Sequence, residues 1–386
     1  MQLHLPDPTP DALAASRALS RQIADDIARH DGWICFARYM ELALYAPDLG
    51  YYSGGAAKLG KDGDFTTAPE MTALFGATLA HAAGELMAQS APHILEFGAG
   101  TGKLARDILS ACACAGIPVE SYTIIDLSGE LRARQRQTLA DFPQVRWLDA
   151  MPAAFSGVAI GNEVLDAMPV SLVVKTPSGW MERGVAVRDG RFVFEDRACD
   201  PALPAQIPEA DRLPVGYVTE VHPVAAAFMG TLAAMLTAGW RDSGQGGAAI
   251  LIDYGFPANE YYLDQRATGT LMCHYRHHAH DDPFYLPGLQ DITAHVDFSA
   301  MAAAAMQGGL DLGCYASQAG FLLAAGLPQQ LMRLSPEEPS RYLAQANAVQ
   351  RLTSPAEMGE LFKVLVVGKG VAPPDGWARA DRGFRL

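Results

Sequence analysis

The amino-acid sequence predicts an α/β fold built on a doubly wound parallel sheet, with a helical N-terminal extension and an antiparallel or irregular insertion. Between His93 and Ile160, short apolar runs alternate with helical patterns, which is typical of parallel strands joined by crossover helices. Near Val170 the alternation stops, and short runs joined by turn pairs such as Asp189-Gly190 follow. These pairs predict hairpins, which indicate the insertion.

Composition and charge narrow the class of protein. The chain has 386 residues, of which 49% are hydrophobic and 19% charged, so it is globular and long enough for one large domain or two lobes. Its net charge of −14 argues against nonspecific binding to nucleic acid or to an anionic membrane surface. The six cysteines include no CxxC pair, so we expect neither a disulfide framework nor a four-cysteine zinc site, and we predict a cytoplasmic protein.

Two segments bear on targeting and membranes. The first residues, MQLHLPDPTP, have neither the pattern of a signal peptide nor that of a transit peptide. The longest apolar stretch, residues 224–240, is one residue short of the roughly 18 that a membrane span needs. We therefore predict a buried helix there and no membrane span.

The elements follow in order along the chain. Residues 11–46 predict two helices, because Leu19, Ile23 and Ile27 recur at near-helical spacing. Residues 49–70 are rich in glycine and polar side chains with interleaved aromatics, which indicates a functional loop. The remaining predictions are strands at 93–97, 122–125, 145–148, 157–160, 248–256 and 362–367, and helices at 103–115, 130–140 and around Met301.

A glycine-rich turn at residues 98–102 joins the first predicted strand to the first helix of the alternating region. Because Gly98, Gly100 and Gly102 have no side chain, a ligand can approach the backbone and the amides at the helix start. A dinucleotide fingerprint requires its third glycine one place later, where Lys103 stands. The spacing favours S-adenosylmethionine over NAD, and a turn that binds nothing is the alternative.

Carboxylates follow the predicted strands at the edge where an open α/β sheet binds its ligand. Asp126 ends the second strand, where it can accept both hydroxyls of a ribose, and Asp149 follows the third as a ligand group, a helix cap or a surface residue. Asn162, Glu163 and Asp166 follow the fourth strand and are the leading catalytic candidates. The alternative, acids that complement a helix dipole, suits Asp166 better than Glu163.

Seven segments resemble, in order, those of the MidA-like methyltransferases, a family that includes the mitochondrial complex I assembly methyltransferase. The resemblance extends from about residue 15 to residue 370. Its first, third and sixth segments are more specific than the glycine turn, which most class I methyltransferases share. The segments are GDFTTAPEMTALFG (63–76), ILEFGAGTGKLARDIL (94–109), GNEVLDAMP (161–169), LIDYGF (251–256), GTLMCHYRHH (269–278), DITAHVDF (291–298) and SQAGFLLAAGL (317–327).

The resemblance implies a Rossmann-like core of the class I methyltransferase type that uses S-adenosyl-L-methionine. Asp126 stands where many members carry glutamate, which shortens the reach toward a ribose. The implied division of the chain is an N-terminal helical extension and cofactor-closing loop (1–90), the core (91–170, 216–256 and 299–370), substrate-binding insertions (171–215 and 257–298) and a C-terminal tail (371–386).

The expected site residues fall into two groups. A loop containing Phe65 and Thr67 is expected to close over the cofactor, with docking of the helical extension as the alternative. The residues expected at the cofactor are Thr66, Pro69, Glu96, Gly98, Ala99, Gly100, Gly102, Asp126, Leu127, Asp149 and Asn162, and those expected at the substrate are Asp253, Tyr254, Arg276, His295 and Asp297.

The resemblance makes a protein arginine the leading methyl acceptor, because the mitochondrial member is known for symmetric dimethylation of an arginine in a complex I subunit. A guanidinium stays protonated, and its nitrogens are poor nucleophiles until carboxylates fix it. Glu163 and Asp166 could form such a clamp, with Glu220 and Asp253 in reserve. The expected reaction is an in-line displacement that needs no metal. The expected partner is a protein substrate, which could be a subunit of a respiratory complex. A second copy of the chain, in a homodimer, is the other expected partner.

Other interpretations remain open. Residues 273–282 contain four histidines and two acids, but their spacing matches no standard zinc pattern, so we favour a lid loop over a metal site. His295 and Asp297 could line the same pocket or satisfy each other in a core. One rival function is a cofactor-binding assembly factor without turnover, which the acids Glu163 and Asp166 argue against. The other is an NAD-dependent oxidoreductase, which Lys103 disfavours.

Overall fold

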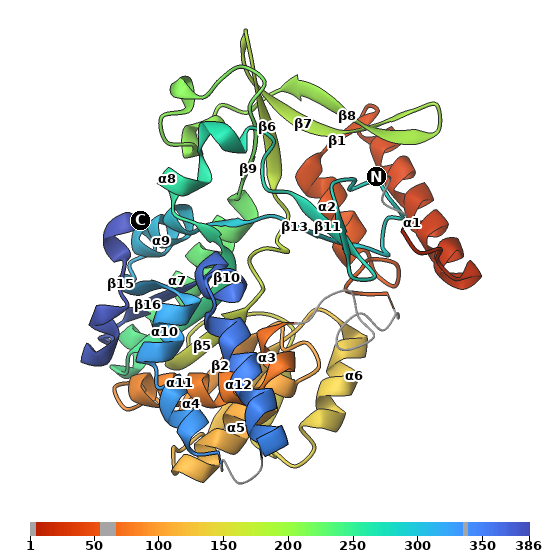
Figure 1. The fold of residues 1–386 in the computed structure, drawn as a ribbon. Helices are drawn as coiled ribbons and strands as arrows, with labels where there is room; N and C mark the ends of the chain where they lie inside the picture. Colours follow the sequence, from red (N-terminus) through yellow and green to blue (C-terminus); the bar gives the residue numbers. More distant parts are fainter. Residues whose placement is uncertain (1–4, 55–66, 335–338) are drawn as a thin grey trace. The chain divides into compact units, whose positions relative to one another are not determined.

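The computed structural model describes residues 5–54, 67–334 and 339–386. The described chain separates into two compact units, each assembled from stretches that are distant in the sequence (Figure 1). The first unit contains the described residues up to 54 with Asp166–Ala225 and Ala258–Ala300, and the second contains residues 67–165, Ala226–Pro257 and the described residues of Met301–Leu386.

The second unit is built on seven strands hydrogen-bonded in the order β15-β16-β10-β5-β2-β3-β4. From β10 to β4 the neighbouring strands are parallel, whereas β16 is antiparallel to both β10 and β15. The chain enters at β2 in the middle, and the order reverses between β2 and β5. In such sheets ligands bind outside the carboxyl ends of the strands at the reversal. The strands are β2 (His93–Phe97), β3 (Ser121–Ile125), β4 (Val145–Leu148), β5 (Gly157–Asn162), β10 (Gly247–Phe256), β15 (Asp311–Ser317) and β16 (Phe362–Lys369).

Helices of this unit bury apolar side chains against the sheet. On α5, Leu104, Ile108 and Cys112 recur at helical spacing and join the core cluster that contains Ile94 and Ile160 of the strands. The helices of the unit that lie wholly in it are α3 (Ala68–Met71), α4 (Ala73–Met87), α5 (Lys103–Ala115), α6 (Gly129–Thr138), α10 (Gln318–Ala324), α11 (Leu327–Met332), α12 (Pro339–Thr353) and α13 (Met358–Leu361), with 3₁₀ helices η4 (Asp375–Arg379) and η5 (Gly383–Arg385).

Helix α7 (Pro223–Ser243) is long and apolar enough to cross a membrane, judged by length and composition alone. Its 18-residue window has a mean hydropathy of 1.4, and 39% of that window is buried. Within the second unit, the ring of Phe228 packs edge-on against Phe97 with centroids 5.0 Å apart, and Met229 and Leu232 have no exposed surface. These contacts place one face of α7 in the core of the second unit.

The first unit combines antiparallel strands with two N-terminal helices. Its larger sheet has the order β1-β7-β6-β9, with β8 paired to β7. Asp189 and Gly190 form the two-residue turn between β7 and β8, both with positive φ (51° and 72°), as the sequence predicts. The elements are α1 (Pro10–Arg29), β1 (Trp33–Cys35), α2 (Phe36–Tyr45), β6 (Ser171–Thr176), β7 (Gly179–Arg188), β8 (Arg191–Ala198), η1 (Pro204–Gln206), η2 (Ala210–Arg212), β9 (Val218–Val221), α8 (Ala258–Tyr261), η3 (Asp264–Arg266), β11 (Met272–Tyr275), β12 (His278–His280), β13 (Asp291–Thr293) and β14 (Val296–Asp297).

The predicted fold class is confirmed: a mostly parallel α/β sheet, a helical N-terminus and an antiparallel region are all present. The alanine-rich helix around Met301 is α9 (Phe298–Gln307). Strand β15 was not predicted from the sequence. Its pairing with β16 is irregular between Leu312 and Cys314, where Gly313 interrupts the apolar pattern that marks a strand.

Candidate active site

The glycine turn joins β2 to α5 in a conformation that only glycine adopts readily. Gly98, Gly100 and Gly102 all have positive φ, at 60°, 52° and 81°. A Cβ on Gly102 would lie 3.2 Å from the Cα of Gln135, a backbone atom that cannot easily move. Gly102 is also the N-cap of α5, and no side chain caps this helix. The first amides of α5 are therefore available to a ligand.

Glu96 precedes the turn and is buried. Its Oε2 accepts a hydrogen bond from the Tyr122 hydroxyl at 2.7 Å. Burial raises the pKa of the Glu96 carboxyl to about 8, and the nearby Asp126 charge adds to the effect. Glu96 is therefore largely protonated at neutral pH.

The Glu96 carboxyl should make stability depend on pH. Because its folded-state pKa is raised, the free energy of unfolding should fall as the pH rises from about 5 to 8, where the unfolded chain has already released this proton. Glu96→Gln should match the wild-type protein near pH 5 and exceed it at pH 9 by several kcal/mol, at about 1.4 kcal/mol per pKa unit. Urea unfolding at pH 5, 7 and 9 measures this; parallel declines in both proteins would contradict it.

Asp126 follows β3 and is fixed by two donors. Its Oδ1 accepts from the backbone N–H of Ser128 at 2.9 Å, and its Oδ2 accepts from Nε2 of Gln135 at 2.7 Å. Burial raises the pKa of this carboxyl, and these two hydrogen bonds oppose the rise. The next residue, Leu127, is 76% exposed. A fixed acceptor thus lies beside an uncovered apolar group.

Asp149 follows β4 and is exposed. Its Oδ1 accepts from the Arg132 guanidinium at 2.6 Å. Arg132 also donates to the backbone carbonyls of Asp126 (2.9 Å) and Leu148 (2.7 Å). Arg132, which sequence reasoning did not single out, therefore ties the ends of β3 and β4 together.

The residues after β5 have an unusual local geometry. Glu163 is a non-glycine residue with φ 54°, and its backbone N–H donates to the carbonyl of Ile252 at 2.8 Å. Its Oε1 accepts from Nδ2 of Asn162 at 3.0 Å. The Oδ1 of Asn162 is buried and has no hydrogen-bond partner among the described residues. Strained backbone and an unsatisfied buried acceptor therefore meet at one strand end.

Asp253 supports this strand end by accepting from three backbone amides. Its Oδ2 accepts from the backbone N–H groups of Val164 (3.1 Å) and Leu165 (2.9 Å), and its Oδ1 accepts from the N–H of Tyr254 (2.9 Å). Tyr254 packs edge-on against Phe362. In the structure Asp253 braces the loop that carries Glu163.

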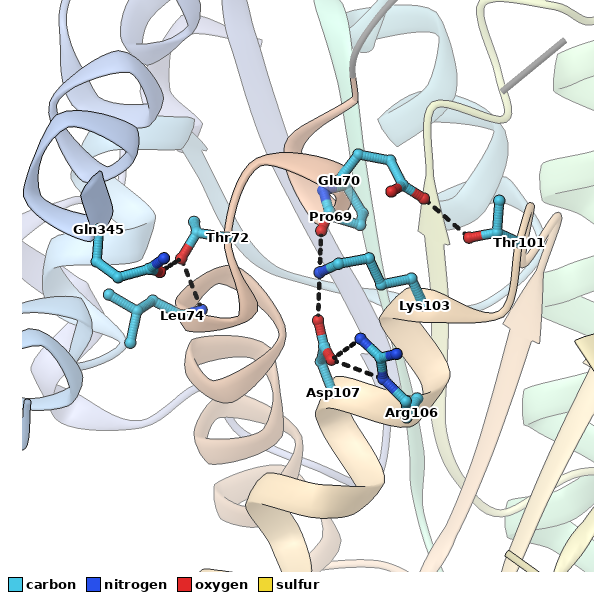
Figure 2. A network of polar contacts seen from close by, with 9 residues as sticks. All are labelled: Pro69, Glu70, Thr72, Leu74, Thr101, Lys103, Arg106, Asp107 and Gln345. Atoms are coloured by element: carbon cyan, nitrogen blue, oxygen red, sulfur yellow. Dashed lines mark hydrogen bonds and ion pairs between the residues drawn. The ribbon is translucent and has the colours of Figure 1, made fainter. Parts of the chain in front are cut away.

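A short helix, α3, is fastened to the glycine turn (Figure 2). The Lys103 ammonium donates to the carbonyl of Pro69 at 2.5 Å and to Oδ2 of Asp107 at 2.6 Å. The Thr101 hydroxyl donates to Oε1 of Glu70 at 2.8 Å. The loop residues Phe65 and Thr66 lie outside the described residues, so the cofactor-closing role of the loop stays a prediction.

Neither Glu70 nor Lys103 was a predicted site residue, although one signal was present. A lysine at the first position of a helix is unfavourable for the helix dipole, so its presence there suggests another partner. Figure 2 shows that partner: Lys103 points toward α3 and lies between Pro69 and Asp107.

Loss of the Lys103 ammonium should lower the free energy of unfolding of the second unit. Lys103→Met removes both hydrogen bonds and leaves Asp107 with Arg106 as its cation. Since a hydrogen bond to a charged group contributes about 1.5–3 kcal/mol, the free energy of unfolding should fall by roughly 2 kcal/mol in urea denaturation. The control, Arg351→Met, removes an exposed ion pair with Glu357 that should contribute at most about 1 kcal/mol. Equal small losses in both variants would show that Lys103 does not fasten α3.

Four predicted residues lie in the first unit and are described by their contacts there. Asp166 accepts from the N–H of Ala294 through its backbone carbonyl, at 3.0 Å. Arg276 lies in the turn of the β11–β12 hairpin, with φ 47°, and its guanidinium donates to the carbonyl of Asp7 at 3.0 Å. The backbone N–H of His295 donates to the Thr270 hydroxyl at 3.0 Å.

Asp297 is buried and caps a helix. Its Oδ1 accepts from the N–H of Ala300 in the first turn of α9 at 3.1 Å, and its Oδ2 accepts from the Tyr262 hydroxyl at 3.0 Å. Burial raises the pKa of this carboxyl. Within the described residues, no group of three or more His, Cys, Asp or Glu side chains is arranged to hold a metal ion.

Glu220, a reserve candidate for the acid clamp, is buried in a network of donors. Its Oε1 accepts from the N–H groups of Thr270 (2.8 Å) and Leu271 (3.0 Å). Its Oε2 accepts from the hydroxyls of Tyr261 (3.0 Å) and Thr270 (3.1 Å). With four donors on its two oxygens, Glu220 organises the 269–271 segment.

Comparison with known proteins identifies the family. The profile of Methyltransf_28, described as "Putative S-adenosyl-L-methionine-dependent methyltransferase", matches residues 75–315. "Protein arginine methyltransferase NDUFAF7, mitochondrial" of Danio rerio is 30% identical over 378 residues, which cover 87% of this chain and 83% of that protein. The Mus musculus protein of the same name is 30% identical and covers 86% of this chain and 80% of its own length.

Solved structures agree with this assignment. A protein from Burkholderia thailandensis, crystallised with S-adenosyl-homocysteine bound, is 52% identical, has a TM-score of 0.93 and covers 99% of this chain and 100% of its own. A native crystal structure from the same organism is also 52% identical, with a TM-score of 0.91 and the same coverage. The chain therefore belongs to the Methyltransf_28 family, the MidA-like methyltransferases, and is an S-adenosyl-L-methionine-dependent methyltransferase.

Proposed function

We propose that this enzyme methylates an arginine side chain of a protein substrate. Relatives that match over most of this chain are named protein arginine methyltransferases. Glu163 is the structural observation that carries the proposal, because its carboxylate follows β5 on a left-handed backbone with φ 54°. That conformation costs about 1–3 kcal/mol outside glycine and persists only where the surrounding contacts hold it, and residues of this kind cluster at active sites.

The described residues at the strand ends fit an adenosyl cofactor. The glycine turn removes the side chains that would block close approach, and the N-terminus of α5 lacks a side-chain cap. We propose that Asp126 accepts the ribose hydroxyls and that the exposed side chain of Leu127 covers an apolar face of the adenine. The buried Oδ1 of Asn162, which has no partner among the described residues, would accept from the amino group of the methionine part.

Other predicted cofactor residues have weaker support. Asp149 is exposed and paired with Arg132, so it would have to exchange that partner to bind the adenine. Glu96 is largely protonated, and it would influence cofactor binding through the glycine turn that it precedes. Pro69 is held by Lys103 beside the turn, which supports its proposed place near the cofactor.

In the proposed methyl transfer, the protein contributes mainly the alignment of the acceptor and a negative charge beside it. When bound, the cofactor supplies an electrophilic methyl group on a sulfonium sulfur. The Glu163 carboxylate would fix one edge of the guanidinium and take up the proton that the nitrogen releases as the N–C bond forms and the S–C bond breaks. Neutral S-adenosylhomocysteine leaves. Asp253 would keep Glu163 in place by holding the amides of Val164 and Leu165.

Asp166 belongs to the first unit and Glu163 to the second, so their action as a two-acid clamp stays a prediction. The same holds for a respiratory-complex substrate, for a homodimer and for the substrate roles of Asp253, Tyr254, Arg276, His295 and Asp297. The cytoplasmic location also stays a prediction, since the relatives are named mitochondrial. All six cysteines are free thiols, as a reducing compartment allows.

Transfer of a labelled methyl group tests the proposed acceptor. The enzyme would be incubated with methyl-labelled S-adenosyl-L-methionine and a lysate treated to remove small molecules, and the labelled proteins hydrolysed to amino acids. We expect the label in methylated arginine in the wild-type reaction and its loss in Glu163→Gln. The control, Glu130→Gln, changes a carboxylate on α6 and should keep the label. Label in methyl-lysine or in methyl esters would overturn the arginine proposal, and cofactor binding without any transfer would support an assembly factor instead.

A further inference from the structure

Helix α6 buries one of its ten residues, and that residue is polar. Gln135 has no exposed surface, whereas the rest of the helix is partly or fully exposed. A helix packed on a sheet normally buries apolar side chains. A buried polar group is costly unless it is hydrogen-bonded, so its contacts indicate why it is there.

The Gln135 amide contacts the ends of three neighbouring strands. Its Nε2 donates to Oδ2 of Asp126, after β3, at 2.7 Å, and to the carbonyl of Gly100, after β2, at 3.0 Å. Its Oε1 accepts from the indole N–H of Trp147, in β4, at 2.9 Å. One side chain therefore joins the glycine turn to the acid that follows the second strand of the sheet.

The orientation of the amide follows from its partners. An indole N–H is only a donor, so it must face the amide oxygen. Both amide hydrogens are then directed at the two acceptors, the Gly100 carbonyl and the Asp126 carboxylate. An apolar residue at this position would leave these two acceptors without that donor.

Asp126 is consequently fixed from both sides. Ser128 holds Oδ1 and Gln135 holds Oδ2, which sets the plane of the carboxylate. Each oxygen keeps lone pairs for further donors. A carboxylate in a fixed plane can receive the two adjacent hydroxyls of a ribose without first losing rotational freedom.

We propose that Gln135 is a positioning residue that orients Asp126 toward the ribose and so gives the enzyme a preference for a cofactor with a 2′-hydroxyl. This inference rests on the proposed cofactor site at the glycine turn and Asp126. Gln135 acts through Asp126 and need not touch the cofactor.

The test compares two ligands on matched variants by isothermal titration calorimetry. The ligands are S-adenosylhomocysteine and its 2′-deoxy analogue, and the variants are Gln135→Leu and the control Gln318→Leu. Gln318 is equally buried in the second unit but donates to the carbonyl of Leu352. We expect Gln135→Leu to raise the Kd of S-adenosylhomocysteine about tenfold and that of the deoxy analogue less than threefold, and the control to keep the wild-type preference.

A second variant covers the case in which Gln135→Leu does not fold. Trp147→Phe keeps Gln135 but removes the donor that fixes its amide, so the preference for the 2′-hydroxyl should fall about threefold. Equal weakening of both ligands, or an unchanged preference in the folded variants, would overturn the positioning role. Failure of the wild-type protein to bind S-adenosylhomocysteine would instead overturn the proposed cofactor site, and this inference with it.

Discussion

Replacing Glu163 by glutamine is expected to lower kcat for methyl transfer by about 10²-fold or more and to leave the Kd of S-adenosylhomocysteine within about twofold. A positioned general base contributes roughly 10²–10⁴-fold, and the amide cannot take up the proton released by the acceptor. Glutamine retains the Oε1 that accepts from Asn162, so the local contact survives. Single-turnover kinetics, together with titration of the product, separates the two effects.

Glu163→Gly distinguishes the carboxylate from the backbone. Glycine adopts φ 54° without strain, so this variant should fold at least as well as the wild type and be as inactive as Glu163→Gln. Activity in the glycine variant would mean that the conformation of the strand end matters and the carboxylate does not. Wild-type kcat in Glu163→Gln would remove Glu163 from the mechanism.

Gly102→Ala is expected to raise the Kd of S-adenosylhomocysteine at least about 30-fold. The added Cβ would lie 3.2 Å from the Cα of Gln135 on a backbone with φ 81°, so either α6 gives way by a few tenths of an ångström or the strained turn shifts. Movement of the turn displaces the uncapped amides at the start of α5. Isothermal titration calorimetry measures the change.

Gly116→Ala is the matched control, because it introduces the same kind of backbone strain at the other end of α5. Gly116 has φ 68°, and a Cβ there meets no atom within 4 Å. Both variants should lose about 1 kcal/mol of stability from the left-handed conformation, while only Gly102→Ala should lose cofactor affinity. Comparable affinities in the two variants would show that the shape of the turn does not control binding.

Local patterns predict the parts of this enzyme that depend on neighbours in the sequence. A few consecutive residues suffice to predict the glycine turn, the acid after β3 and the Asp189-Gly190 hairpin. The structure contains all three. The resemblance to a known family supplied the cofactor and the reaction class, which the family comparison confirms.

What local patterns miss are contacts between distant residues. Gln135 is an ordinary polar residue in the sequence, and only the packing of α6 against β2, β3 and β4 gives it three partners. Likewise, Asp253 holds the backbone amide of Val164, from which 89 positions of the chain separate it. Such roles depend on which strand ends meet, and the sequence alone does not specify that.

The division into two units has a consequence for synthesis of the chain. The polypeptide passes between the units five times, so neither unit corresponds to one continuous segment. In the first unit, Leu19, Ile23 and Phe36 pack in the same cluster as Val185 and Ile292. At a translation rate of about 5–20 residues per second, the apolar faces of α1 and α2 stay without these partners for roughly 10 to 50 s. Nascent chains of this enzyme should therefore be clients of chaperones that shield apolar helices until translation nears its end.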